Sequence, residues 1–153
     1  AWSGAVEAYA SYSFNIGHQR LNSPTHPITW YNVHNMRPSL TLNMLSDSGA
    51  DYSTIDSKHA GTLGVNLTSG IPATVQGTGG QVENTFYIHQ IPFKIGNLHP
   101  RTALVAMGRG AGTDVFGRTK GLNWYDVSYT QNMVRYTELA QANMATVQRW
   151  KKW

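Results

Sequence analysis

The chain has 153 residues, a length typical of one domain. Its 41% hydrophobic and 13% charged residues exclude a highly charged disordered protein. The absence of cysteine excludes a disulfide scaffold and a thiol nucleophile. The net charge of +4 is too small to indicate nucleic-acid binding by itself. No apolar run approaches the roughly 20 residues of a membrane-spanning helix, so no membrane partner is expected.

The composition favours a mostly β domain. Its 15 glycines, with many Ser, Thr and Asn residues, are typical of short strands joined by turns. After Arg37, Gly, Pro and Asn separate short apolar runs. These runs predict strands over 39–45, 51–55, 72–76, 82–88, 91–95 and 102–107. Asp56, a capping residue, and the glycine at 64 predict one or two helical turns between them.

The N-terminal part of the chain lacks this pattern of short apolar runs separated by turn residues. Residues 1–36 are rich in aromatic side chains without a clear period and contain two prolines, so we expect an extension with few regular elements. His18, His26 and His34 recur every eight residues, which suits neither one helical face nor a compact metal site. We interpret them as solvated polar residues of a loop-rich arm.

The C-terminal part has a helical period. Between residues 131 and 150, apolar side chains recur at steps of three and four: Met133, Tyr136, Ala140, Met144 and Val147. This spacing predicts an amphipathic helix. The predicted organisation is an N-terminal extension at 1–36, a β domain at 37–127 and a helical extension at 128–153.

An acidic residue on a glycine-containing turn is a candidate catalytic residue. Asp47, Ser48, Gly49 and Ala50 follow the apolar run 40–45, which places a carboxylate directly after a predicted strand. Hydrolysis of a peptide by water needs one group that takes a proton and one that donates a proton. Two carboxyls that share one proton supply both. The Asp-Ser-Gly sequence occurs once, so a second copy of the chain is predicted to provide the other carboxyl.

Two further segments suit this chemistry. The first, 75–82, is glycine-rich between two apolar arms, which is typical of a mobile hairpin whose backbone N–H groups can bind an extended peptide. Its tip consists of Gly77, Thr78, Gly79 and Gly80. The second, about 70 residues after the acid, consists of Val115, Phe116, Gly117 and Arg118.

In this order, the three segments resemble the retropepsins, the dimeric aspartic proteases of retroviruses and LTR retrotransposons, over residues 37–124. The resemblance implies a closed β-barrel with its active site at a homodimer interface and with no cofactor or metal. It implies an aspartic endopeptidase that cleaves a polyprotein and releases itself, in a virion or virus-like particle or in the host cytoplasm. The partners would be a second copy of the chain and extended polyprotein segments.

The resemblance also implies roles for individual residues. Asp47 would be the catalytic carboxylate, and Ser48 and Gly49 would support its turn. Substrate-binding residues would be Ala50, Asp51, Gly77, Thr78, Gly79, Gly80, Thr113 and Val115. An ionic network would comprise Asp51, Arg118 and Arg37 of the partner subunit. Only ten positions separate Arg37 from Asp47, fewer than the family usually has, so a hairpin is expected to be missing there.

Other functions stay open. A retropepsin-like domain without turnover, or a basic adaptor that binds nucleic acid or a protein through its C-terminal helix, is the alternative to a protease. Residues 112–119 nearly match a phosphate-binding loop, but Arg118 stands at the position of the required lysine. Nucleotide binding is therefore not favoured.

Overall fold

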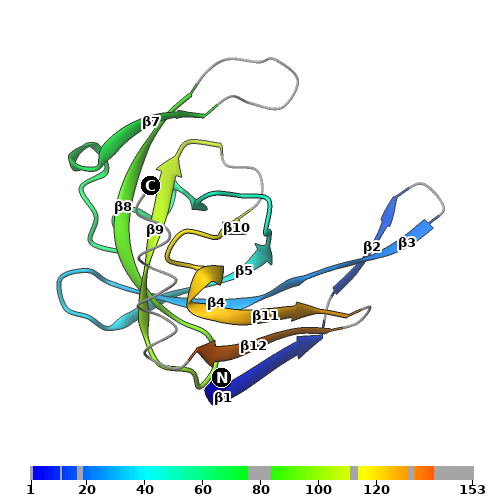
Figure 1. Cartoon of the computed structure of the whole chain (residues 1–153). Helices are drawn as coiled ribbons and strands as arrows, with labels where there is room; N and C mark the ends of the chain where they lie inside the picture. The colour runs from blue at the N-terminus through cyan, green and yellow to red at the C-terminus, as the bar shows by residue number, and fades with distance from the viewer. Residues whose placement is uncertain are drawn as a thin grey trace.

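The computed structural model describes residues 2–10, 12–16, 19–75, 84–110, 114–130 and 133–139 (Figure 1). Over these ranges the chain is mainly β, and no helix there is long and apolar enough to span a bilayer. The strands are β1 (Trp2–Ala10), β2 (Tyr12–Ile16), β3 (Gln19–Ser23), β4 (Thr25–Tyr31), β5 (Pro38–Ser46), β6 (Ser53–Asp56), β7 (Ile71–Val75), β8 (Asn84–Lys94), β9 (Arg101–Gly108), β10 (Val115–Phe116), β11 (Tyr125–Tyr129) and β12 (Met133–Leu139). Short 3₁₀ helices are η1 (Ser57–His59), η2 (Leu67–Ser69) and η3 (Leu122–Trp124).

A seven-stranded sheet closes into a β-barrel. Its strands are hydrogen-bonded in the order β4, β5, β10, β6, β9, β8 and β7. An additional pairing between β4 and β8 closes a ring of six strands, and β7 extends the sheet from β8. The closing pairs are Thr29 with Lys94 and Trp30 with Phe93. β10 is parallel to β5 and antiparallel to β6, so it lies between the two strands that flank residues 47–52. The predicted all-β barrel is confirmed.

Aromatic side chains pack the barrel interior. Trp30, Phe93 and Phe116 are fully buried, and their ring centroids lie 5.5 Å apart for Trp30 and Phe93 and 5.2 Å apart for Phe93 and Phe116. Aromatic pairs at such distances contribute about 0.5–1.5 kcal/mol each beyond the area they bury. The cluster holds β10 against β4 and β8, the two strands that close the barrel.

The strands predicted for the middle of the chain are confirmed with one change. The predicted strands 82–88 and 91–95 are one continuous strand where the structure describes them, β8, which continues through Pro92. The helical turn expected after Asp56 is η1, whose first turn is capped because the Lys58 backbone N–H donates to Asp56 Oδ1 at 2.8 Å.

The expectation of few regular elements in residues 1–36 is wrong. Strands β1 to β4 occupy most of this segment, and β4 belongs to the barrel. In β4 the buried residues His26, Ile28 and Trp30 alternate with partly exposed ones, which is the period of a strand with one face in the core. Pro27 is tolerated because, among the described strands, β4 pairs only with β5 at that position. His26, interpreted as solvated, is fully buried.

As expected, no complete hairpin lies between Arg37 and Asp47, because the first strand of the hairpin before the acid precedes Arg37. β4 and β5 form an antiparallel hairpin that leads directly into Asp47. Arg37 lies at the turn of this hairpin, where its carbonyl accepts from the Asn32 N–H at 2.9 Å. The short interval between Arg37 and Asp47 contains only the second strand of the hairpin, because the first strand precedes Arg37.

A second antiparallel sheet, ordered β1, β12, β11, is called here the terminal sheet (Figure 1). Its middle strand contradicts the helix predicted over 131–150, at least for residues 133–139; residues 140–150 lie outside the described ranges. Val134, Tyr136 and Glu138 are buried at every second position, which is the strand period. The three-residue step from Met133 to Tyr136 fits a helix equally well, and short apolar runs leave this ambiguity.

The remaining strands, β2 and β3, pair with each other in a hairpin. Figure 1 shows that this hairpin projects away from both the barrel and the terminal sheet.

Candidate active site

The turn that follows β5 presents the Asp47 carboxylate. The Ala50 backbone N–H donates to the Asp47 carbonyl at 3.2 Å, and the Gly49 N–H donates to Asp47 Oδ1 at 2.9 Å. Asp47 is half-buried, whereas Ser48 and Gly49 are exposed. The turn thus holds one carboxylate oxygen by its own backbone and leaves Ser48 at the surface, where a partner subunit could reach it.

Strand β10 fixes the start of this turn. The Asp47 N–H donates to the Phe116 carbonyl at 3.1 Å, and the Leu45 N–H donates to the Asp114 carbonyl at 2.9 Å. Val115, which was predicted to bind substrate, is half-buried and pairs with Leu45. Two segments about 70 residues apart in the sequence are therefore bonded directly to each other.

Gly117 has a steric reason to be glycine. A Cβ at this position would lie 2.4 Å from the Tyr52 carbonyl oxygen, a distance that side-chain atoms do not tolerate. The Gly117 N–H donates to Ser53 Oγ at 3.1 Å, and the next N–H, from Arg118, donates to the Ala50 carbonyl at 3.0 Å. The second motif therefore packs backbone to backbone against the segment that follows the acid.

The structure brings two members of the predicted ionic network together. Asp51 and Arg118 form an ion pair within one chain, with 71% and 42% of their side chains exposed. Arg37 lies at the opposite end of β5 from Asp47, about 30 Å away at roughly 3.3 Å per residue. The fold gives Arg37 no place in the network within one chain. Its contact with a partner subunit stays a prediction.

The predicted substrate hairpin is described only at its base. β7 and β8 are antiparallel and pair from Ile71 with Ile88 to Val75 with Asn84, as the arms of a hairpin must. Four residues predicted to contact substrate at its tip lie outside the described ranges: Gly77, Thr78, Gly79 and Gly80. Thr113 also lies outside them.

A buried polar cluster adjoins the Asp47 turn, and the sequence did not predict it. Ser46 Oγ, 3.0 Å from His26 Nε2, also hydrogen-bonds with the Tyr136 hydroxyl, which in turn contacts His26 Nε2. His26 Nδ1 lies 3.3 Å from the Pro27 carbonyl, which can only accept, so Nδ1 carries the proton and Nε2 accepts. Burial lowers the pKa of His26 to about 4, although the bond to Pro27 opposes this shift.

A tyrosine of the terminal sheet also lies near the acid. In the sheet register Tyr129 pairs with Val134, which shares its face with Tyr136. Tyr129 is 43% exposed. Burial and the negative charge of Asp47 both raise the pKa of Tyr129. Sequence reasoning missed Tyr129 because its segment lies beyond the recognised motifs.

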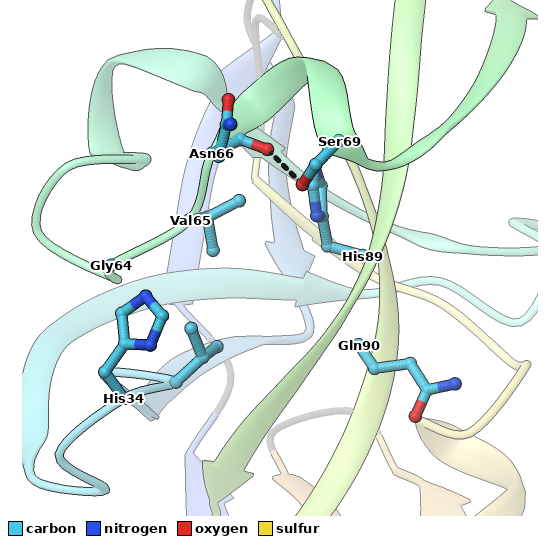
Figure 2. A pocket seen from close by; sticks show the side chains of 8 residues that line it. His34, Gly64, Val65, Asn66, Ser69, His89 and Gln90 are labelled. Atoms are coloured by element: carbon cyan, nitrogen blue, oxygen red, sulfur yellow. Dashed lines mark hydrogen bonds between the residues drawn. The ribbon is translucent and has the colours of Figure 1, made fainter.

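A separate pocket of about 220 Å³ (Figure 2) is lined in part by residues of the β4–β5 turn. This turn is at the other end of β5 from Asp47. Figure 2 shows the lining of the pocket, where Ser69 Oγ donates to the Asn66 carbonyl at 2.7 Å. Its described lining contains no carboxylate and consists of Val33, His34, Gly64, Val65, Asn66, Ser69, His89 and Gln90. These residues cannot supply the paired acids that the proposed chemistry needs.

Within the described ranges, no three His, Cys, Asp or Glu side chains are grouped to hold a metal ion. Residues 35–116, over half of the chain, match the family model described as "Aspartyl protease". The chain belongs to the aspartyl protease family. The matched part of this aspartyl protease contains Asp47 and its turn and ends at Phe116, the residue whose carbonyl holds the Asp47 N–H.

Comparison with solved structures gives two matches, of which the first supports the fold of this aspartyl protease. A retropepsin-like aspartic protease from Rickettsia conorii matches with 14% sequence identity and a TM-score of 0.57, over 92% of this chain and 98% of that chain. The EIAV protease complexed with the inhibitor HBY-793 matches with 23% identity and a TM-score of 0.42, over 63% of this chain and 82% of that chain. No curated protein sequence matches the chain. The predicted retropepsin-like fold and aspartic-type peptidase activity are confirmed.

Proposed function

We propose that this aspartyl protease acts as a homodimer in which Asp47 of each chain supplies one carboxyl of the catalytic dyad. The observation that carries the proposal is the hydrogen-bonded assembly of the Asp47 turn with β10. The sequence has one Asp-Ser-Gly turn, so a dyad of such carboxyls needs two chains. Because Ser48 and Gly49 are exposed, a second copy of the chain can approach this turn.

The chemistry follows from two carboxyls that share a proton. Like charges roughly 3 Å apart cannot both ionise, so the pair keeps one proton over the working pH range. The ionised carboxyl takes a proton from the attacking water, and the protonated one donates a hydrogen bond to the peptide carbonyl. The tetrahedral intermediate then collapses as the amine is protonated, without an acyl-enzyme.

The substrate is proposed to be an extended peptide segment. The paired strands β7 and β8 form the base of a hairpin whose predicted tip would close over the peptide and bind it through backbone N–H groups. Cleavage of a retroviral or retrotransposon polyprotein, with self-release in a virion or virus-like particle or in the host cytoplasm, is the biological role that the sequence resemblance suggests. Similarity to a bacterial protein makes a cellular substrate the competing role.

Asp47→Asn tests the catalytic assignment. We expect this variant to lose cleavage of a fluorogenic extended peptide at mildly acidic pH while its sedimentation as a dimer is retained. Asp126→Asn is the matched control, because Asp126 is an exposed acid of β11 and its replacement removes the same charge. An active Asp47→Asn enzyme, or a wild-type chain that is active as a strict monomer, would show that the dyad is misassigned. A folded dimer without any peptidase activity would favour the non-catalytic binding module.

A further inference from the structure

The cluster of His26, Ser46 and Tyr136 lies where the terminal sheet meets the catalytic strand. Ser46 is the residue directly before Asp47, and its backbone N–H donates to the Pro24 carbonyl at 3.0 Å. Its side chain is bound by Tyr136 from β12 and by His26 from β4. Ser46, the last residue of β5, is thus held by a backbone bond to the residue before β4 and by side-chain bonds to β4 and β12.

All three strands of the terminal sheet contribute aromatic rings around this cluster. Tyr9 of β1 stacks on His26 with ring centroids 4.9 Å apart and an interplanar angle of 15°. Tyr125 of β11 packs edge-on against Tyr136 of β12, with centroids 5.5 Å apart. His26 and Tyr136 are fully buried, and Ser46 is 4% exposed. The Tyr136 and Ser46 hydroxyls are therefore enclosed between the sheet and the barrel.

We propose that His26, Ser46 and Tyr136 are positioning residues through which the terminal sheet fixes the backbone that carries Asp47. Apolar contacts alone would let the sheet slide or tilt against the barrel, whereas hydrogen bonds define one distance and one direction. Fully satisfied buried polar networks rigidify a core in this way. The inference rests on the proposed catalytic role of Asp47.

The expected effect lies in turnover rather than in substrate binding. A displacement of a catalytic group by about 1 Å can lower the rate by about 10²-fold. Ser46→Ala removes the link next to Asp47, and Tyr136→Phe removes the hydroxyl that the sheet contributes. Neither change touches the peptide-binding hairpin. We therefore expect kcat to fall by about tenfold or more in each variant, with little change in KM.

Tyr125→Phe is a matched control. The Tyr125 hydroxyl is buried in the same sheet and has no hydrogen-bond partner in the described part of the chain. Its removal deletes the same atom from the same kind of residue without breaking the cluster. We expect wild-type kcat for this variant.

The assay measures kcat per active site, with sites counted by titration with a tight-binding transition-state peptide mimic. A merely structural role would reduce the number of titrated sites and leave the turnover of each site unchanged. We also expect the Ser46→Ala/Tyr136→Phe double variant to lose no more activity than the more impaired single variant, because both changes break one link.

Two results would overturn the inference: wild-type kcat per site in Ser46→Ala and Tyr136→Phe, or an equal loss in Tyr125→Phe. Failure of the proposed function is recognised separately, by an Asp47→Asn variant that still cleaves the peptide, by a wild-type chain that is active as a strict monomer, or by a folded wild-type dimer without peptidase activity. Loss of cleavage in Asp47→Asn with normal turnover in the cluster variants would retain the dyad and reject the positioning network.

Discussion

Acidification should destabilise this protein through His26, and the size of the effect follows from its burial. The pKa of His26 is lowered from 6.5 to about 4, chiefly because the folded barrel removes the ring from water. At about 1.4 kcal/mol per pKa unit, this difference corresponds to about 3 kcal/mol of stability. That is a large part of the 5–15 kcal/mol or so by which typical domains are stable.

The direction of the effect is set by which state binds the proton. Above pH 6.5 the ring is neutral in the folded and the unfolded chain, so the folded state keeps its full stability. Between pH 6.5 and about 4 the unfolded chain binds a proton that the folded chain does not, so the free energy of unfolding falls as the pH falls. Below about pH 4 both states are protonated and the loss is complete. Tyr9 and Tyr136 stay neutral throughout, because burial raises the pKa of both.

The test compares wild type with His26→Phe. Phenylalanine keeps a ring against Tyr9, removes the titrating nitrogen and leaves Ser46 and Tyr136 bonded to each other. Urea unfolding at fixed protomer concentration, from pH 7.5 to pH 3.5, gives the free energy of unfolding of each protein. We expect wild type to lose about 3 kcal/mol more than the variant over this range.

The test uses the difference in free energy of unfolding between the two proteins, because acidic groups such as Glu138 also respond to pH. Burial alone would raise the pKa of Glu138, but hydrogen bonds from His99 lower it. This contribution is present in both proteins and cancels. Parallel pH dependences for wild type and His26→Phe would refute the argument that the buried imidazole limits stability in acid.

Two further predictions concern the second motif. Gly117→Ala should destabilise the fold by roughly 3 kcal/mol or more, because its Cβ would collide with a backbone carbonyl, whereas Gly61→Ala, which meets no atom within 4 Å, should change stability by about 0.5 kcal/mol or less. Thermal unfolding of both variants checks this, and equal effects would contradict the steric reason. Arg118→Ala and Asp51→Ala should each lower the free energy of unfolding of the monomer by about 0–1 kcal/mol, because their ion pair is solvent-exposed. Urea unfolding should show non-additive losses in the double variant, and strict additivity would indicate that the pair contributes nothing.

The site motifs were readable from the sequence because their chemistry is local. Asp47 follows an apolar run and lies two residues before Gly49, and Gly117 lies between two apolar residues and Arg118. Each signal lies within a few consecutive residues. The pairing of these two motifs across about 70 residues was predicted only through the family resemblance, since periodicity and turn chemistry do not report long-range contacts.

The parts that failed depend on such long-range contacts. Tyr136 looked like a helical residue because it lies three positions after Met133, but pairing with β1 and β11 selects the strand. His26 looked solvated because histidine and its neighbouring prolines are typical of loops, and only the fold shows that Ser46 and Tyr136 satisfy its nitrogen.

The terminal sheet joins the first and the last described strands, since Trp2 pairs with Leu139. Such a contact closes nearly the whole chain into one loop, and loop closure over long separations slows folding. Ser46 gains its Tyr136 partner only when β12 has emerged and docked. A nascent chain on the ribosome that ends before β12 therefore contains Asp47, its turn and β10, but it lacks the complete terminal sheet that holds them. Peptidase activity should consequently begin only after β12 has been made.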